Sequence, residues 1–241
     1  MEILGLIPAR GGSKGIKGKN IKPLGGRPLI EYTFDAALES KLLSRVILST
    51  DSAEIAKIGK RRGIEVPFLR PADISTDESP AYSYIQHCLD FLKNNEGYEP
   101  GVIVILQPTT PFRHASDIDL CLNLLLQGGS DSVVSVAELP NKYHPDWYQV
   151  IGPDGLLRPY AQRSWEQVAP RRQELTPSYI RNGAVYAFRQ ETFLKTRNIY
   201  GTTVTPYIMP TERSINIDDM SDWQRAEFAI STNNTNFLEN L

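Results

Sequence analysis

The sequence predicts a layered α/β protein with a mainly parallel sheet, and three observations lead to this fold class. Strand-like and helix-like segments alternate along most of the 241 residues. The strand candidates are nearly continuous runs of Val, Ile and Leu, as expected of strands covered on both faces. The helix candidates carry their apolar residues on one face, at helical spacing.

Taken in order, short apolar runs predict strands at 2–7, 45–49, 102–107 and 132–137. Between them, amphipathic segments predict helices at 28–38, 80–93 and 116–126. Ser79 is expected to cap the second of these helices, with Pro80 in its first position. Strand character returns at 184–188 and 214–217. A last helix is expected to open at Ser221, where Gln224 completes a capping-box pattern.

The alternation stops between residues 140 and 181, a stretch with Pro, Trp, Tyr and Arg but no long amphipathic helix. It predicts an excursion from the sheet, either a hairpin arm or a subdomain that contacts a partner. We expect residues 1–230 to form one domain that includes this excursion, followed by a polar tail at 231–241.

The composition is that of a soluble globular protein, with 41% hydrophobic and 22% charged residues. The longest apolar run, residues 102–106, is far shorter than the ~20 residues of a transmembrane helix. The N-terminus lacks the basic patch and apolar core of an ordinary secretory signal. Two cysteines, Cys88 and Cys121, provide neither a disulfide framework nor metal spacing. We therefore expect a cytoplasmic protein that does not contact a membrane.

The net charge of -2 hides an asymmetry along the chain. Residues 1–30 carry six basic groups and one acidic group, so the rest of the chain is acidic. Four of the six basic groups lie in a glycine-rich loop at 7–20, directly after the first strand. Open α/β sheets bind ligands at this edge, and glycine backbone N–H groups there can cradle phosphate oxygens. An extended basic face with interleaved aromatics, which a nucleic-acid-binding protein would show, is missing.

Two familiar phosphate motifs do not fit this loop. A Walker A loop requires Ser or Thr after its Gly-Lys, but Asn20 follows Gly18 and Lys19. The Gly-x-Gly-x-x-Gly dinucleotide fingerprint does not occur in the chain. The sequence therefore supports neither a P-loop NTPase nor a Rossmann dehydrogenase.

At these residues the chain resembles the acylneuraminate cytidylyltransferases, the enzymes that make CMP-sialic acid and related CMP-nonulosonates. Residues 7–20 match the family's signature, and shorter matches follow in order, so that the resemblance covers residues 3–230. These are 49–51 (Ser-Thr-Asp), 70–71 (Arg-Pro), 107–113 (Gln-Pro-Thr-Thr-Pro-Phe-Arg), 170–173 (Pro-Arg-Arg-Gln), 182–184 (Asn-Gly-Ala) and 214–218 (Ser-Ile-Asn-Ile-Asp). The resemblance implies a three-layer GT-A-like nucleotidyltransferase fold and a homodimer. It also implies CTP and a nonulosonic acid as substrates, and Mg²⁺ as cofactor.

The resemblance also implies roles for individual residues. The implied nucleotide site consists of Arg10, Gly11, Gly12, Ser13, Lys19, Asn20 and Arg70. Within it, Arg10, Ser13 and Lys19 would hold the triphosphate, and Arg70 would recognise the cytosine. The implied sugar site consists of Gln107, Arg172 and Asn182, with Arg172 reaching its own or the partner subunit's site. The catalytic residues would be Arg10, Lys19, Arg172 and Asp218.

The implied metal site lies at residues 216 and 218. Alternate residues of a strand share a face, so these two side chains are expected to point together. The family usually has Asp at both positions, and such a pair binds Mg²⁺ through hard oxygens. This chain has Asn216, which lacks the charge, so Asp218 is the expected ligand and Asn216 a weaker candidate.

Three other functions remain open from the sequence. A different sugar nucleotidyltransferase, such as a CMP-Kdo synthetase or one for hexose 1-phosphates, would share the fold, but the segments 107–111 and 170–173 favour nonulosonates. A non-catalytic nucleotide-binding module would explain Asn216. A nucleic-acid-binding protein would explain the basic loop but not the acidic remainder.

Overall fold

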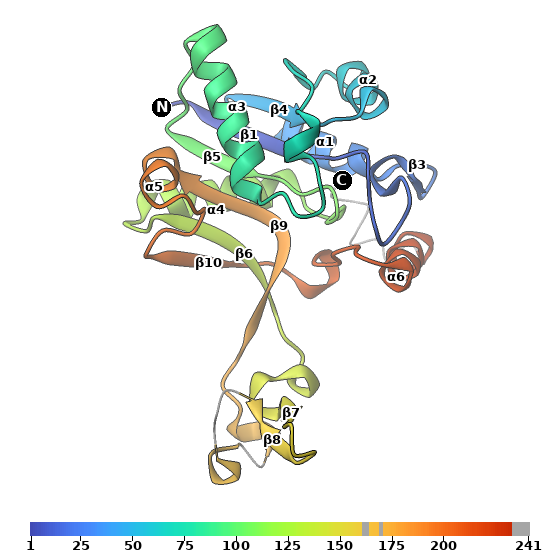
Figure 1. The fold of residues 1–241 in the computed structure, drawn as a ribbon, viewed down its shortest axis with the longest axis vertical. Helices are drawn as coiled ribbons and strands as arrows, with labels where there is room; N and C mark the ends of the chain where they lie inside the picture. Colours follow the sequence, from blue (N-terminus) through green and yellow to red (C-terminus); the bar gives the residue numbers. More distant parts are fainter. Residues whose placement is uncertain (161–163, 169–170, 233–241) are drawn as a thin grey trace.

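The central sheet has six strands in the order β10-β6-β9-β5-β1-β4 (Figure 1). Their bounds are β1 (Ile3–Pro8), β4 (Arg45–Ser49), β5 (Val102–Ile105), β6 (Ser132–Glu138), β9 (Tyr179–Arg189) and β10 (Val204–Ile208). β9 runs antiparallel to both of its neighbours, and the other pairs are parallel. The predicted α/β class with a mainly parallel sheet is therefore confirmed. This computed structural model describes residues 1–160, 164–168 and 171–232.

Helices cover both faces of the sheet (Figure 1). Their bounds are α1 (Leu29–Glu39), α2 (Ala53–Arg61), α3 (Ala81–Glu96), α4 (Ala115–Gln127), α5 (Gln190–Thr196) and α6 (Met220–Ser231). Two short antiparallel pairs complete the strands, namely β2 (Pro23–Leu24) with β3 (Arg27–Pro28) and β7 (Gln149–Ile151) with β8 (Leu157–Pro159). None of the helices in the described part of the chain is long and apolar enough to cross a membrane.

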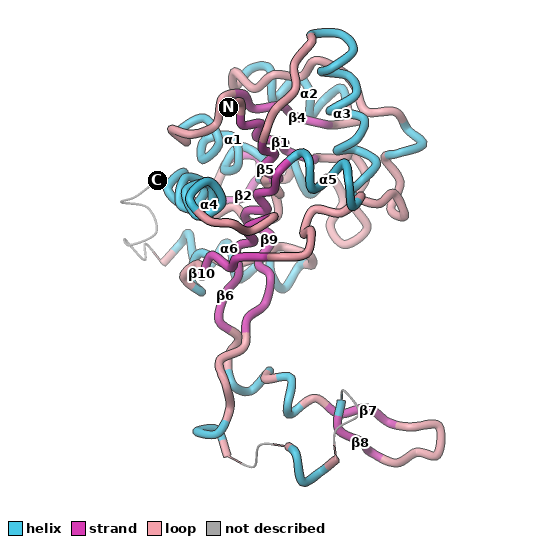
Figure 2. The backbone as a smooth tube through the Cα atoms, turned by 90° about the vertical axis from the view of Figure 1, so that its left-hand side faces the viewer, coloured by secondary structure: helices cyan, strands magenta, loops and turns pink. Residues whose placement is uncertain are grey.

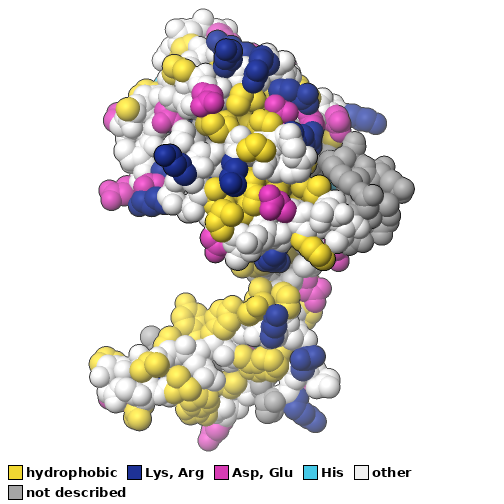
Figure 3. Space-filling model, turned by 90° about the vertical axis from the view of Figure 1, so that its right-hand side faces the viewer, with side chains coloured by type: hydrophobic (Ala, Val, Ile, Leu, Met, Phe, Trp, Pro, Cys, Tyr) yellow, Lys and Arg dark blue, Asp and Glu magenta, His cyan; other side chains and the backbone are white. Residues whose placement is uncertain are grey.

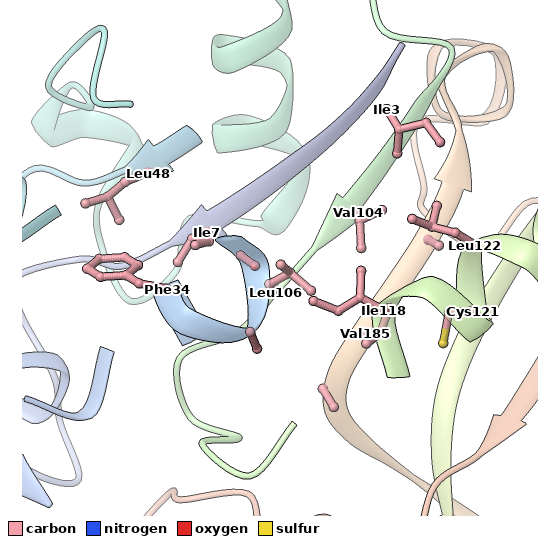
Figure 4. Close-up of a cluster of buried hydrophobic side chains, with 14 of the residues drawn as sticks. Ile3, Ile7, Phe34, Leu48, Val104, Leu106, Ile118, Cys121, Leu122 and Val185 are labelled. Atoms are coloured by element: carbon pink, nitrogen blue, oxygen red, sulfur yellow. The ribbon is translucent and has the colours of Figure 1, made fainter. Parts of the chain in front are cut away.

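The period-two alternation of the strands divides the core between the two faces. In β1, Ile3 and Ile7 pack with residues of α1 and α4 (Figure 4), whereas Leu4 and Leu6 pack on the opposite face with residues of α3 and α5. The side chains of β5 alternate between the two faces in the same way. Both cysteines are buried free thiols in these clusters. The layers hold the carboxyl ends of β1, β4 and β5 at one edge of the sheet.

Two of the predicted helix starts are wrong by a small shift. α3 begins at Ala81 with Pro80 as its N-cap, and Ser79 instead accepts a hydrogen bond from the backbone N–H of Thr76 at 3.1 Å. α6 begins at Met220, and Asp219 caps it by accepting from the N–H of Ser221 at 2.8 Å. An aspartate is as good an N-cap as a serine, and it stands closer to the true start.

The strand predicted at 214–217 does not form, and a strand that was not predicted, β10, takes the edge of the sheet. The segment 214–217 is held by single hydrogen bonds instead of a ladder, such as Ile217 N–H to the carbonyl of Thr109 at 2.8 Å. β10 contains Pro206, which argues against a central strand but is tolerated at an edge. The sequence pattern could not distinguish the irregular segment at 214–217 from the edge strand β10.

The chain between β6 and β9 forms an arm, residues 139–178, that extends away from the sheet (Figures 1 and 2). The pairing of Glu138 with Tyr179 closes its base. Hydrophobic side chains gather on its surface (Figure 3), and Ile151, Leu156 and Trp165 are 74%, 61% and 53% exposed. Residues 161–163 and 169–170 of the arm and residues 233–241 of the predicted tail lie outside the described residues.

Candidate active site

A pocket of about 510 Å³ lies at the carboxyl ends of β1 and β5, where open α/β sheets bind ligands. Four segments line it. They are the glycine-rich loop after β1, the connector 70–79 with the first turn of α3, the segment 107–109 after β5, and residues 216 and 218. The pocket therefore unites segments from both ends of the chain, and most of its lining side chains are polar or charged.

The backbone of the glycine-rich loop is fixed on both sides of Arg10. The Ala9 N–H donates to the carbonyl of Ser49 at 2.9 Å, and the Gly11 N–H donates to Asp51 Oδ1 at 2.8 Å. Asn20 Nδ2 donates to the carbonyl of Arg10 at 3.0 Å. Since its backbone is held in this way, the Arg10 side chain extends into the pocket from a rigid base.

Further along the loop, Gly15 lies against the other end of the chain. A side chain at this position would collide with the backbone carbonyl of Asp218. Only glycine allows the loop to approach this carbonyl so closely. Ser13 and Asn20, on either side of the contact, both line the pocket.

Lys19 connects the loop to the segment that carries Asp218. Its Nζ donates a hydrogen bond to the carbonyl of Ile217 at 2.7 Å and lies 3.8 Å from Asp218 Oδ1. Burial lowers the pKa of Lys19, and the nearby Arg10 lowers it further, while Asp218 acts in the opposite sense. A half-buried ammonium at this place is a strong electrostatic ligand for a phosphate.

Asn216 and Asp218 do point together, as predicted, although they do not lie in a strand. Asn216 Nδ2 donates to Asp218 Oδ2 at 2.7 Å. Asn216 Oδ1 is buried and has no hydrogen-bond partner among the described residues. An unpaired buried acceptor of this kind costs ~1–3 kcal/mol, so the site offers an oxygen to a ligand.

These two side chains fit a hard cation such as Mg²⁺ in their chemistry, because both residues line the same pocket and both carry oxygen ligands. Within the described residues no group of three or more His, Cys, Asp or Glu side chains could hold a metal ion. Any cation here would therefore need additional oxygen ligands, which a triphosphate can provide.

Gln107 lines the pocket and is positioned by the buried Arg113. Arg113 is fully buried and donates to the carbonyls of Gln107 and Ala184, at 2.6 and 2.7 Å, and to Thr33 Oγ1 at 3.1 Å. Burial lowers the pKa of Arg113 to about 10, and it remains charged at neutral pH. The side-chain amide of Gln107 stands over Gly183, where a Cβ would lie only 2.8 Å from Oε1.

Arg70 also lines the pocket. It is 6% exposed, and it donates to Ser49 Oγ at 3.0 Å and to the Ser49 carbonyl at 2.5 Å. Its guanidinium lies 4.9 Å from the ring centre of Tyr84, which also lines the pocket. Burial lowers the pKa of Arg70 and raises that of Tyr84. The guanidinium and the ring thus pack against each other in the lining of the pocket.

Most of the predicted site residues thus come together, but four do not line this pocket. The Gly11 N–H is already bound to Asp51, and Gly12 stands in open space. Asn182 is 3% exposed and bonds Ser135 and Ser214 behind the site. Arg172 lies exposed on the arm, in the turn Arg172–Glu174, and Pro170 of its motif lies outside the described residues.

Sequence reasoning missed Asp51, Asp77 and Tyr84. Asp51 lies in the matched segment 49–51 but was given no role in the site, and it accepts a hydrogen bond from the Gly11 N–H, whereas Ser52 caps α2. Asp77 forms ion pairs with Arg10 and Lys14 from a connector that has no periodic pattern. Tyr84 lies within the helix predicted at 80–93, where nothing in the sequence sets it apart from its neighbours. Asp51 follows the end of a strand, as the glycine-rich loop does, and this position was the one signal that could have revealed it.

Comparisons with known proteins agree on one family. A family model described as cytidylyltransferase matches residues 4–209. The chain is 33% identical over 235 residues to the CMP-N,N'-diacetyllegionaminic acid synthase of Legionella pneumophila, which covers 97% of this chain and 98% of that protein. It is 30% identical over 230 residues to the N-acylneuraminate cytidylyltransferase of Escherichia coli O18:K1:H7, covering 93% of this chain but 51% of that protein.

The chain thus spans about half the length of several N-acylneuraminate cytidylyltransferases that it matches. Among solved structures, it is similar to a CMP:2-keto-3-deoxy-manno-octonic acid synthetase complexed with CTP. The TM-score is 0.70, with 14% identity and coverage of 96% of this chain and 99% of that one. At this identity the likeness concerns the fold alone, and it matches the predicted three-layer nucleotidyltransferase architecture.

Proposed function

The chain belongs to the cytidylyltransferase family, and on that premise we propose that it transfers the cytidylyl group of CTP to a nonulosonic acid. The C2 hydroxyl oxygen of the sugar acid forms a bond to the α-phosphorus of CTP. The bond from that phosphorus to the bridging oxygen breaks, pyrophosphate leaves, and the hydroxyl proton passes to solvent. The observation that carries this proposal is the single pocket that joins Arg10, Lys19, Gln107 and Asp218.

In this reaction the residues of the pocket position the substrates and neutralise charge. Arg10 and Lys19, with Ser13 and Asn20 beside them, hold the triphosphate and the leaving pyrophosphate. Such transfers depend mainly on alignment and on electrostatic stabilisation of the phosphoryl oxygens. No covalent enzyme intermediate is needed, because the hydroxyl attacks directly.

The two remaining polar walls fit the other parts of the substrates. Arg70 and Tyr84 together line the part of the pocket that would contact the cytosine. Gln107, which also lines the pocket, offers an amide that suits the carboxylate and hydroxyls of a sugar acid.

Asp218 and Asn216 would hold a Mg²⁺ ion, together with oxygens of CTP. When bound, the ion supplies charge neutralisation at the α-phosphate. The protein's part is to keep both oxygens in place. The hydrogen bond from Asn216 Nδ2 orients Asp218, and Lys19 fixes the carbonyl of the residue between them.

We also propose that the protein is a homodimer that uses the arm as its contact surface. The exposed side chains of Ile151, Leu156 and Trp165 support this, because apolar patches of this kind mark protein interfaces. Arg172 lies on the same arm. In the dimer it would reach the pocket of the partner, where its guanidinium suits a substrate carboxylate.

The reaction is assigned to the cytoplasm, where CTP is available and where buried thiols such as Cys88 and Cys121 stay reduced. The direct test is pyrophosphate release with CTP and a panel of sugar acids. The panel includes N,N'-diacetyllegionaminic acid, N-acetylneuraminic acid, pseudaminic acid and Kdo. Release with a nonulosonic acid and not with Kdo is expected. CTP binding without pyrophosphate release for any of the acids would mean that the protein is a non-catalytic nucleotide-binding module.

A further inference from the structure

The carboxylate of Asp77 stands between two cations of the glycine-rich loop. Asp77 Oδ1 pairs with the guanidinium of Arg10, and Oδ2 lies 3.1 Å from Lys14 Nζ. These ion pairs hold the pKa of Asp77 below its usual value. All three side chains line the pocket. The carboxylate of Asp77 therefore occupies the position beside Arg10 at which the proposed function requires a phosphate of CTP.

The connector that carries Asp77 is weakly attached elsewhere. Within the described chain, the hydrogen bonds and ion pairs of residues 71–79 are internal to that segment, except for those of Asp77. None of its residues is buried. Asp77 thus supplies the polar tether between this connector and the loop.

The loop itself is anchored far better than the connector. The carbonyl of Arg10 is bound by Asn20, and the N–H groups of Ala9 and Gly11 bind Ser49 and Asp51. If a second anion competes for Arg10, we expect it to displace the carboxylate of Asp77. The hydrogen bonds of the loop backbone keep Arg10 in place, whereas the connector can move away.

We propose that Asp77 is an internal competitor of the substrate's triphosphate and so sets the affinity of this site for CTP. This inference rests on the proposed function, because it takes Arg10 as a phosphate ligand, and it adds Lys14, which lines the same pocket. Binding of the triphosphate exchanges the Asp77 pairs for pairs with phosphate and releases the connector 71–79. CTP must break the ion pairs of Asp77 before it can pair with the same cations. The loss of these pairs offsets part of the binding free energy, so the affinity for CTP is lower than it would be without Asp77.

The test is calorimetric titration of the full chain with CTP, and separately with inorganic tripolyphosphate, for wild type and Asp77→Asn. The variant should bind both ligands more tightly, with Kd lowered about three- to tenfold, as expected from losing two partly exposed ion pairs and a like charge. A loss of structure alone could not produce tighter binding. Asp77→Ser repeats the test with a side chain that cannot mimic the carboxylate.

Glu78→Gln is the matched control. It removes the same charge from the neighbouring exposed position, and no ion pair of Glu78 is found in the described structure. It should change Kd by less than about twofold. Unchanged or weaker binding in both Asp77 variants would overturn the proposal and make Asp77 an orienting partner of Arg10. Equal tightening in Glu78→Gln would also overturn it. If wild type binds tripolyphosphate but not CTP, the proposed function fails while the Asp77 comparison remains decisive.

Discussion

The ammonium group of Lys19 donates a hydrogen bond to the backbone carbonyl of Ile217, at 2.7 Å and across 198 residues of sequence. This contact joins the glycine-rich loop to the segment that carries Asn216 and Asp218. The residues proposed to bind the triphosphate and those proposed to bind the cation are therefore held in one geometry. A change in either segment is expected to disturb both.

Lys19→Ala should lower kcat/KM by about 100-fold or more, because it removes a charge that stabilises the transferring phosphoryl group. Pyrophosphate release under steady-state conditions measures this effect. Lys17→Ala is the control, since Lys17 is an exposed lysine of the same loop and does not line the pocket. Near-normal turnover of the Lys19 variant would remove this residue from the mechanism.

The lowered pKa of Lys19 predicts the pH profile of the free enzyme. The protonated amine is the active form, and kcat/KM reports the pKa of the free enzyme. Activity should therefore fall as pH rises through a value below the ordinary 10.5 of lysine. Lys19→Arg should move this alkaline limb to higher pH, because arginine keeps its proton. An alkaline limb at the same pH in both proteins would assign it to another group.

The helices could be predicted because a half-buried helix imposes its apolar period on the sequence. The strands could be predicted because strands covered on both faces appear as continuous apolar runs, as 45–49 and 102–107 show. The strand predicted at 214–217 was wrong, because the apolar residues of this segment pack into a hydrophobic cluster without forming regular secondary structure. The edge strand around Pro206 carried no such pattern. Burial of Arg113 and the pairing of Asp77 depend on contacts distant in sequence, which no local pattern encodes.

The Asn216 position predicts how strongly the site binds a cation. Asn216→Asp adds a carboxylate beside Asp218 and should tighten Mn²⁺ binding about tenfold, because affinity rises with ligand charge. Asp218→Asn should abolish both Mn²⁺ binding and Mg²⁺-dependent turnover. Electron paramagnetic resonance titration with Mn²⁺ measures binding without any turnover.

Asp219→Asn is the control for these two variants. It removes the adjacent charge but keeps an equally good helix cap. Its Mn²⁺ affinity should stay close to wild type. Loss of binding in this variant to the same degree as in Asp218→Asn would contradict a specific role for Asp218.

Arg113→Met should lower the free energy of unfolding by about 2–4 kcal/mol, because it removes the guanidinium that donates to the carbonyls of Gln107 and Ala184 and to Thr33 Oγ1. Urea-induced unfolding measures the loss. Arg225→Ala, at a side chain that is 69% exposed, should change stability by less than about 0.5 kcal/mol. Equal stability of the two variants would show that Arg113 does not support the segment after β5.

The arm predicts the oligomeric state. Ile151→Asp places a charge on the exposed apolar surface and should convert a dimer to monomers in sedimentation equilibrium. Phe228→Asp, an equally exposed apolar position on α6, should leave the dimer intact. A wild-type monomer would contradict the proposed interface.

Complementation tests whether Arg172 acts in the partner's pocket. Inactive Arg172→Ala and Lys19→Ala proteins are mixed and allowed to exchange subunits. The mixture should recover about a quarter of wild-type activity, because half of the dimers are mixed and each has one intact site. No recovery after demonstrated exchange would mean that Arg172 does not act across the dimer.

The antiparallel course of β9 has a consequence for how this fold can change. Because Glu138 and Tyr179 are already paired at the base of the arm, the ends of the intervening chain stay together whatever its length. Lengthening or replacing such a closed segment adds little entropic penalty to folding. The arm is thus an exchangeable module, which can be redesigned or grafted from a relative while the sheet and its pocket remain as they are.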